Sequence, residues 1–323
     1  MTNGDELFLL LSEELNFHKA AKNAHISQQC LSDHIKRLEN KYGTTLFYRK
    51  PKVTLTLAGE AVRRALQRVR LQEQRLLKEL DEIEQGDNGN LTVGINSTRA
   101  PLLLPSLCSN YINLFPKVQL QFVIDDTKRM EEKLIKGELD CFIGINTELT
   151  PQYSIMPLSK DQIYVICTRS LFQKHHPDIN LYNDTVLMDS ISIHKFQHIP
   201  FVRNLSKSTL TLLVDQFVIQ EDALIKTALS VSDHSTQIKL CASGAVAAFC
   251  PSMMLQNIFK YNETATDDPI LIFPINGLDQ HLRIDLVFHR GIHYPRYAKV
   301  FFEMIRSSVA QSISLLKQKY GVH

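Results

Sequence analysis

Small and apolar residues between positions 16 and 59 recur at helical spacing, and they predict two short helices followed by a hairpin. Ala20, Ala21 and Ala24 keep one face of the first helix thin, so that a second helix can cross it closely. The second helix turns three apolar residues at i, i+4 and i+7 toward the first: Leu31, Ile35 and Leu38. This pattern is typical of a helix-turn-helix pair.

The exposed side of the second helix has the chemistry to contact bases. Ser27 stands where this helix should begin and can cap its free backbone N–H groups, which leaves Gln28, Gln29 and Ser32 on the outer side. A glutamine amide offers a donor and an acceptor together, as adenine does in the major groove, and the first turns of such a helix normally enter that groove. The pattern therefore predicts a winged helix-turn-helix domain over residues 1–60 that binds double-stranded DNA.

Local charge favours the same interpretation. The whole chain has a net charge of only +2, but residues 17–70 contain twelve Lys or Arg and three Asp or Glu, an excess of nine positive charges. A charge run alone is usually a solvated helix face, but this one coincides with the helix pair and with the basic turn at residues 49–52. The candidate DNA-binding residues are Ser27, Gln28, Gln29, Ser32, Asp33, His34, Lys36, Arg37, Arg49, Lys50 and Lys52.

A single long helix is expected from residue 56 to residue 85. Its apolar residues follow alternating steps of four and three, with Glu73 filling one position: Val62, Leu66, Val69, Leu76, Leu80 and Ile83. Such a seam is buried by a partner helix, so residues 57–86 are expected to form a linker that makes a homodimer or homotetramer. The alternative is a helix packed on its own domain. Gly86, Asp87, Asn88, Gly89 and Asn90 predict a break after it.

After residue 90 short apolar runs alternate with amphipathic stretches, which predicts an α/β domain over residues 90–323. Helices are expected at about 101–114 and 130–136. Three more are expected, of which one begins near 209, one ends at 243–244 and one begins near 295. The expected strands are 91–95, 118–124, 140–145, 163–168, 199–203, 229–232, 246–251, a run near 272 and 283–290, with 186–193 uncertain. Crossover strands near 163–168 and 272–277 divide the domain into lobe I, about 90–165 and 275–323, and lobe II, about 166–274.

Polar residues after these strands are candidates for a ligand cleft between the lobes, because ligands bind outside the carboxyl ends of strands in open α/β sheets. Hydroxyl groups and arginines there suit a small organic anion, and Ser97 and Thr98 are the strongest candidates. Serine and threonine after a strand are often only helix caps, and an exposed arginine is often only solvated. The candidate ligand-binding residues are Ser97, Thr98, Arg99, Thr127, Asn146, Thr147, Arg203 and Asn204.

The run AAKNAHISQQCLSDHIKRLENKYGTTLFYRK, followed by LTLAGE, resembles the amino-terminal signature of LysR-type transcriptional regulators. Two alanines precede a Ser-Gln helix, a Leu-Glu pair, a Leu-Phe-x-Arg wing and a Thr-x-Ala-Gly helix start. The resemblance implies a multidomain protein: a winged helix-turn-helix domain, a long linker helix and a two-lobed α/β effector domain similar to periplasmic binding proteins. Gln29 and Asp33 replace a common proline and a common basic residue, which leaves the operator sequence open.

The resemblance also implies a small organic effector of unknown identity, and RNA polymerase is a candidate partner. No cofactor and no metal are expected: the cysteines form no Cys-x-x-Cys pair, and the histidines lack metal-ligand spacing. Cys241 and Cys250 have a spacing similar to that of the family's peroxide-sensing branch, but both lie in apolar stretches without a basic neighbour, which disfavours a redox switch.

Two other classes of function were weighed against the regulator. A hydrolase or transferase would be expected to show a Gly-x-Ser-x-Gly elbow, a phosphate loop or paired carboxylates, and none stands out, so no enzymatic activity is expected. A transport-associated binding protein would need an export signal, whereas the first residues carry acids and an interrupted apolar run. A cytoplasmic protein without a membrane span is therefore expected.

Overall fold

The computed structural model describes residues 1–323 except 86, 180, 182–185, 205–207, 265–266 and 321–323. Two compact units make up the chain. One contains Met1–Gly89 with the short segments Ile135–Glu138 and Gly291–Pro295, and the other contains the remainder.

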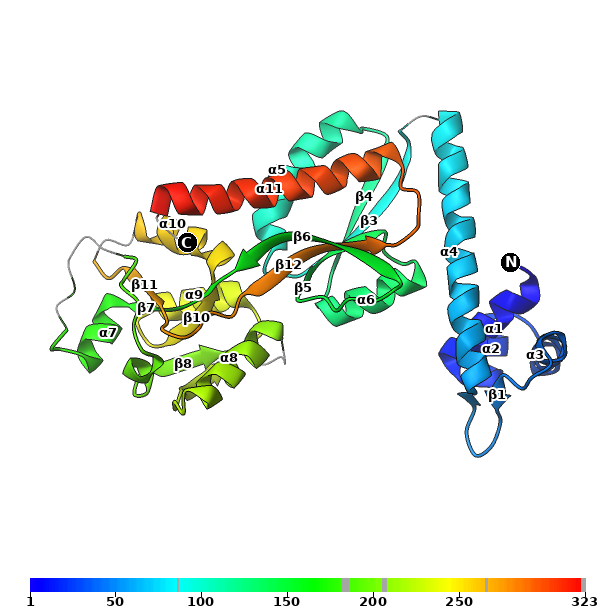
Figure 1. The fold of residues 1–323 in the computed structure, drawn as a ribbon, viewed down its shortest axis with the longest axis horizontal. Helices are drawn as coiled ribbons and strands as arrows, with labels where there is room; N and C mark the ends of the chain where they lie inside the picture. The colour runs from blue at the N-terminus through cyan, green and yellow to red at the C-terminus, as the bar shows by residue number, and fades with distance from the viewer. Residues whose placement is uncertain (86, 180, 182–185, 205–207, 265–266, 321–323) are drawn as a thin grey trace. The chain divides into compact units, whose positions relative to one another are not determined.

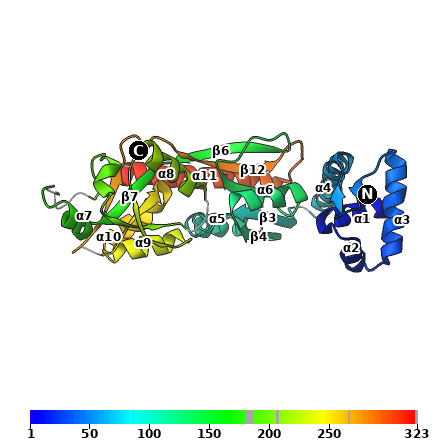
Figure 2. The ribbon, with the colours of Figure 1, turned by 90° about the horizontal axis from the view of Figure 1, so that it is seen from below.

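The first unit begins with three helices, α1 (Asn3–Glu14), α2 (Phe17–Asn23) and α3 (Gln28–Tyr42). A two-stranded hairpin follows, in which β1 (Phe47–Tyr48) pairs antiparallel with β2 (Thr54–Leu55). The chain then enters the long helix α4 (Leu57–Gln85), and Figures 1 and 2 show α1, α2 and α3 gathered around one end of it. This is the predicted helix pair, hairpin and long helix.

Helix α1 was not predicted from the sequence, although it supplies a large part of the core of this unit. Its capping box joins the side chains and backbone of Thr2 and Asp5, which satisfies N–H groups at the helix start. Phe8, Leu9 and Leu11 are each at most 1% exposed and belong to the same cluster as Leu31 and Ile35 of α3. The helix-turn-helix pair therefore rests on a third helix.

Helix α4 has the predicted extent, but its apolar seam divides into two parts. Leu66 is buried in the core of the first unit and Val62 packs against that core, as the alternative of a helix on its own domain requires. Val69, Leu76 and Leu80 are 44%, 55% and 48% exposed, so the later part of the seam is open in the single chain. The side chain of Ile83, and Gly86 of the predicted break, lie outside the described residues.

The second unit holds two five-stranded sheets, each with helices around it (Figure 1). The first sheet has the order β4-β3-β5-β12-β6. Its strands are β3 (Gly89–Ile95), β4 (Val118–Ile124), β5 (Cys141–Ile145), β6 (Tyr153–Asp161) and β12 (Leu282–His289). Helices α5 (Ala100–Leu114), α6 (Thr127–Lys136) and α11 (Arg296–Tyr320) belong to this lobe, and α11 contacts both α5 and β6.

The second sheet has the order β11-β7-β10-β8-β9. Its strands are β7 (Ile163–Thr168), β8 (Pro200–Arg203), β9 (Lys226–Ser230), β10 (Ala247–Pro251) and β11 (Ile270–Pro274). The helices of this lobe are α7 (Arg169–His175), α8 (Thr209–Gln220), α9 (His234–Ala242) and α10 (Leu255–Asn262), with 3₁₀ turns at Ile193–Phe196 and Ser252–Met254. Both sheets are mixed: β3 and β5 are parallel, whereas β12 runs antiparallel to β5 and β6.

Two expectations for this unit need correction, and one strand was missed. All of β7 pairs within the second sheet, so the chain changes sheets at Gln162 and the predicted lobe boundary after residue 165 falls inside a strand. Residues 186–193 form no strand, because their pairing is limited to isolated bridges at Leu187 and Ile191. The edge strand β6 was not predicted.

Candidate DNA-binding surface and effector cleft

The turn between α2 and α3 is built as the sequence predicted. Ala20 and Ala21 are at most 2% exposed, and Leu31 and Ile35 are fully buried against them in one cluster. The Ser27 hydroxyl accepts the backbone N–H of Cys30 at 3.1 Å and caps α3. These contacts fix the direction in which the outer face of α3 points.

The structure leaves most of the candidate residues of α3 accessible. Gln28, Gln29, Asp33, Lys36 and Arg37 are exposed together with the cap Ser27. Ser32 and His34 are half-buried, so Ser32 is less open than the sequence pattern implied. An exposed helix face with two amides at its first turn can donate to and accept from base edges.

The basic turn lies at the tip of the hairpin between β1 and β2. Arg49, Lys50 and Lys52 are all exposed, and the Lys50–Pro51 peptide bond is cis. The Arg49 guanidinium stacks over the Phe17 ring at 5.5 Å and lies 3.5 Å from the Glu39 carboxylate, which is a weak ion pair for an exposed side chain. These three cations are therefore available to phosphate groups.

Glu39, Thr56 and Gly59 position the wing, and sequence reasoning gave them no separate role. Glu39 Oε1 accepts the backbone N–H of Leu46 at 2.9 Å, and the Thr56 hydroxyl donates to the Thr45 carbonyl at 2.8 Å. A Cβ atom on Gly59 would lie 2.1 Å from the Leu46 carbonyl oxygen, so only glycine permits this approach. The Leu-Glu and Thr-x-Ala-Gly spacings were the signal for them.

The comparisons with known proteins agree with this arrangement. Residues 5–60 match the model of the bacterial regulatory helix-turn-helix protein, lysR family, and residues 84–310 match that of the LysR substrate binding domain. The chain belongs to the LysR family.

A relative, the uncharacterized HTH-type transcriptional regulator YcgK of Bacillus subtilis, is 24% identical over 309 residues, which cover 94% of this chain and 93% of the relative. The structure of ArgP from Mycobacterium tuberculosis has a TM-score of 0.65 at 16% identity, covering 96% of this chain and 97% of that one. Full-length CbnR in complex with its target DNA has a TM-score of 0.55 at 19% identity, covering 95% and 100%. The chain is thus a LysR-type transcriptional regulator with a helix-turn-helix domain and a two-lobed α/β substrate-binding domain.

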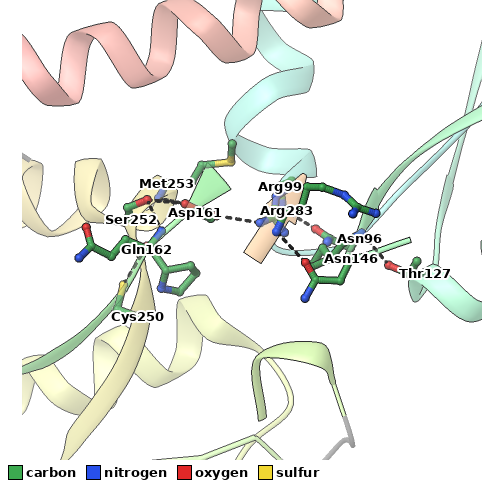
Figure 3. A network of polar contacts seen from close by, with 12 residues as sticks. Asn96, Arg99, Thr127, Asn146, Asp161, Gln162, Cys250, Ser252, Met253 and Arg283 are labelled. Atoms are coloured by element: carbon green, nitrogen blue, oxygen red, sulfur yellow. Dashed lines mark hydrogen bonds and ion pairs between the residues drawn. The ribbon is translucent and has the colours of Figure 1, made fainter. Parts of the chain in front are cut away.

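In the substrate-binding domain several candidate ligand residues already bond within the protein. The Thr127 hydroxyl accepts the backbone N–H of Ile145 at 3.1 Å, and Asn146 Oδ1 accepts that of Arg283 at 2.7 Å (Figure 3). Thr147 is 1% exposed, and its backbone N–H donates to Asp285 at 3.3 Å. The side chains of Thr127 and Asn146 thus bind backbone N–H groups of other segments and do not act as the helix caps that were the alternative expectation.

Arg99 is held by an internal carboxylate. Its Nη2 donates to Asp161 Oδ2 at 2.7 Å, and the two side chains are only 2% and 4% exposed. The other oxygen of Asp161 accepts from the Ser252 hydroxyl and from the Met253 backbone N–H at 2.9 Å, so the network in Figure 3 joins α5 of lobe I to the end of β10 in lobe II. In this arrangement of the lobes Arg99 already has a carboxylate partner, and its pairing with a ligand carboxylate stays a prediction.

Arg203 is engaged in the same way. Its Nη2 pairs with Asp215 of α8, and its guanidinium stacks on Phe249 at 5.5 Å. Arg203 and Asn204 line a hollow of about 10 Å³, which has room for roughly one water molecule. His234 lines the same hollow, and burial together with the nearby Arg99 charge lowers its pKa.

Ser97 and Thr98 are more accessible than Thr147, which is buried and whose hydroxyl likewise has no hydrogen-bond partner. Ser97 is exposed and Thr98 is half-buried, and neither side chain has a hydrogen-bond partner within the described residues. Both lie in the turn between β3 and α5, where Asn96 Oδ1 accepts the Arg99 N–H at 2.9 Å. Two hydroxyl groups therefore remain available to a ligand.

The cysteine pair is poorly placed for redox chemistry. Cys241 and Cys250 are buried, and burial raises the pKa of both thiols. Their Sγ atoms donate to backbone carbonyls of Ile166 and Pro251. Because the thiolate is the reactive form, this environment suppresses oxidation.

Metal sites and membrane-spanning helices are both absent from the described residues. No group of three His, Cys, Asp or Glu side chains there could hold a metal ion. None of the helices there is long and apolar enough to cross a membrane.

Proposed function

We propose that the protein binds specific duplex sequences through Gln28, Gln29 and Ser32 of α3. The observation that supports this most is the exposed pair of amides on the first turn of a helix whose opposite face is fixed in the core. Asp33 and His34 follow on the same stretch of helix and contribute to the choice of sequence, while Ser27 positions the helix start.

The cations around this face supply affinity that does not depend on sequence. Lys36 and Arg37 of α3, and Arg49, Lys50 and Lys52 of the wing, are all exposed. In this proposal they contact phosphates, and each such contact makes binding more sensitive to salt.

The regulator works as a homodimer or homotetramer in this proposal. The exposed Val69, Leu76 and Leu80 supply the surface, because a stripe of apolar residues on a long helix is buried most readily by a second copy. Pairing places two reading helices on one DNA molecule. A DNA-bound regulator of this kind acts in the cytoplasm, where RNA polymerase is a candidate partner.

A small organic effector is proposed to bind between the lobes beside Ser97 and Thr98. The support is that these two hydroxyl groups have no partner in the described protein, whereas Arg99 and Arg203 already have carboxylate partners. An effector that binds one arrangement of the lobes better than another shifts the population toward it.

The DNA-reading role can be tested with full-length protein. A duplex is selected from a random pool, and affinities for it and for a scrambled duplex are compared by fluorescence anisotropy. Gln28→Ala should weaken binding to the selected duplex by about 1–3 kcal/mol and leave the scrambled duplex unchanged. Gln72→Ala, an exposed glutamine on α4, is the matched control. Equal losses on both duplexes would contradict base reading by Gln28.

A further inference from the structure

A second pocket lies away from Ser97 and Thr98, beside the crossover between the lobes. Its volume is about 310 Å³, within the lower range of small-molecule sites. Lobe I contributes Lys160 and Asp161, lobe II contributes Ser252 and Met253, and the last turns of α11 close the remaining side. The α11 residues follow residue 310, where the match to the LysR substrate binding domain ends.

The lining of this pocket combines three apolar side chains with polar ones, among which are two exposed lysines. Met253 and Leu316 are 5% and 6% exposed, and Ile313 is half-buried beside them. Lys160 and Lys317 are exposed, and within the described residues neither has an ion-pair partner. The two ammonium groups therefore carry charge that no carboxylate of the described protein neutralises.

Asp161 does not cancel this charge, although it lines the same pocket. Its two oxygens are already occupied by Arg99 on one side and by Ser252 and Met253 on the other (Figure 3). It is the one carboxylate among the lining residues that the structure describes. An anion in this pocket would thus face two lysines and the exposed His281, and no free carboxylate would repel it.

We propose that this pocket binds a small monocarboxylate with an apolar body. The hydrocarbon part covers Met253, Ile313 and Leu316, and the carboxylate accepts hydrogen bonds from Lys160 and Lys317. Since its walls come from both lobes, an occupant would hold them in the arrangement in which Asp161 of lobe I accepts hydrogen bonds from Ser252 and Met253 of lobe II. This site is separate from the proposed effector cleft, whose Ser97 and Thr98 do not line it.

Calorimetric titration of the full-length protein with octanoate tests the proposal. The uncharged octanamide is the ligand control. The double variant Lys160→Ala with Lys317→Ala should bind octanoate about tenfold more weakly, because each lysine supplies a charge-assisted hydrogen bond. Lys239→Ala removes an equally exposed lysine from α9, outside the pocket, and should leave the affinity unchanged.

A second variant tests the location independently. Ser312→Trp places a large side chain in the pocket from α11 and should abolish octanoate binding, while Thr98→Trp in the effector cleft should not. Urea unfolding of each variant, followed by circular dichroism, shows that its substrate-binding domain is folded. Three results would overturn the proposal: no octanoate binding by the unaltered protein, equal binding of octanamide, or unchanged affinity in the lysine double variant.

Discussion

At the residue scale, Arg99 and Asp161 form an ion pair whose two side chains are both buried, unlike those of the ion pairs that Arg203 and Arg283 form. A buried charge pair contributes little net stability by itself, but loss of one partner leaves the other charge buried and uncompensated. Arg99 Nε is buried without a hydrogen-bond partner, and burial lowers the pKa of this guanidinium although Asp161 opposes the effect. Asp161 thus supplies the counter-charge of the buried Arg99.

Replacement of Asp161 should therefore destabilise the domain strongly. Asp161→Asn should lower its free energy of unfolding by about 3–5 kcal/mol, since the buried Arg99 loses its counter-charge. Asp215→Asn removes the carboxylate that pairs with Arg203, but Asp215 is 49% exposed, so the expected loss is about 0–1 kcal/mol. Urea unfolding of the full chain, followed by circular dichroism, measures both. Similar losses in the two variants would mean that water reaches Arg99.

The sequence contained Arg99 and Arg203 as candidates but could not reveal their partners. Asp161 lies 62 positions from Arg99, and nothing in local spacing connects them. For a similar reason the hydrogen-bond partners of Thr127 and Asn146 could not be predicted. A polar residue after a strand can bind either a ligand or a neighbouring backbone N–H, and only the folded chain shows which. The α3 candidates were more predictable, because helical periodicity alone separates Gln28 from Leu31.

At the element scale, long periodic segments were predictable and short or irregular ones were not. Helix α4 and strand β7 have nearly the expected bounds, because α4 keeps a helical repeat over 29 residues and β7 is a continuous run of buried residues. Strand β6 was missed since it carries Pro157 and several half-buried residues, which a sheet edge tolerates. Residues 186–193 were an uncertain strand, expected because β-branched and apolar residues favour extended chain. In the structure they pair only at isolated bridges.

The open part of the α4 seam gives a prediction at this scale. Leu76→Asp should weaken self-association about 100-fold or more, because a carboxylate buried in an apolar seam has no partner. Leu77→Asp makes the same change one residue off the seam, at a leucine that is 65% exposed, and should have a smaller effect. Sedimentation velocity over a range of protein concentrations measures the association. A Leu76→Asp protein that sediments like the unaltered one would place the interface elsewhere.

At the scale of the whole molecule, charge is concentrated where DNA is expected to bind. The nine excess positive charges of residues 17–70 exceed the net charge of +2 of the complete chain, so the remaining residues are together net acidic. Polyanion binding by such a chain depends on one region, since the rest repels phosphates weakly. Salt dependence should therefore respond to changes in the wing and not to equal changes in the substrate-binding domain.

Two single Lys→Ala substitutions, one in the wing and one in the substrate-binding domain, distinguish local phosphate contacts from an effect of total charge. Lys52→Ala in the wing should reduce the slope of log affinity against log salt by about 0.9, which is the loss of one phosphate contact on duplex DNA. Lys117→Ala removes an equally exposed lysine between α5 and β4, and should leave the slope unchanged although the net charge falls by the same amount. Fluorescence anisotropy with a duplex between about 50 and 200 mM salt measures both slopes. If both variants shift the slope equally, total charge governs binding, and the basic wing has no specific role in holding phosphates.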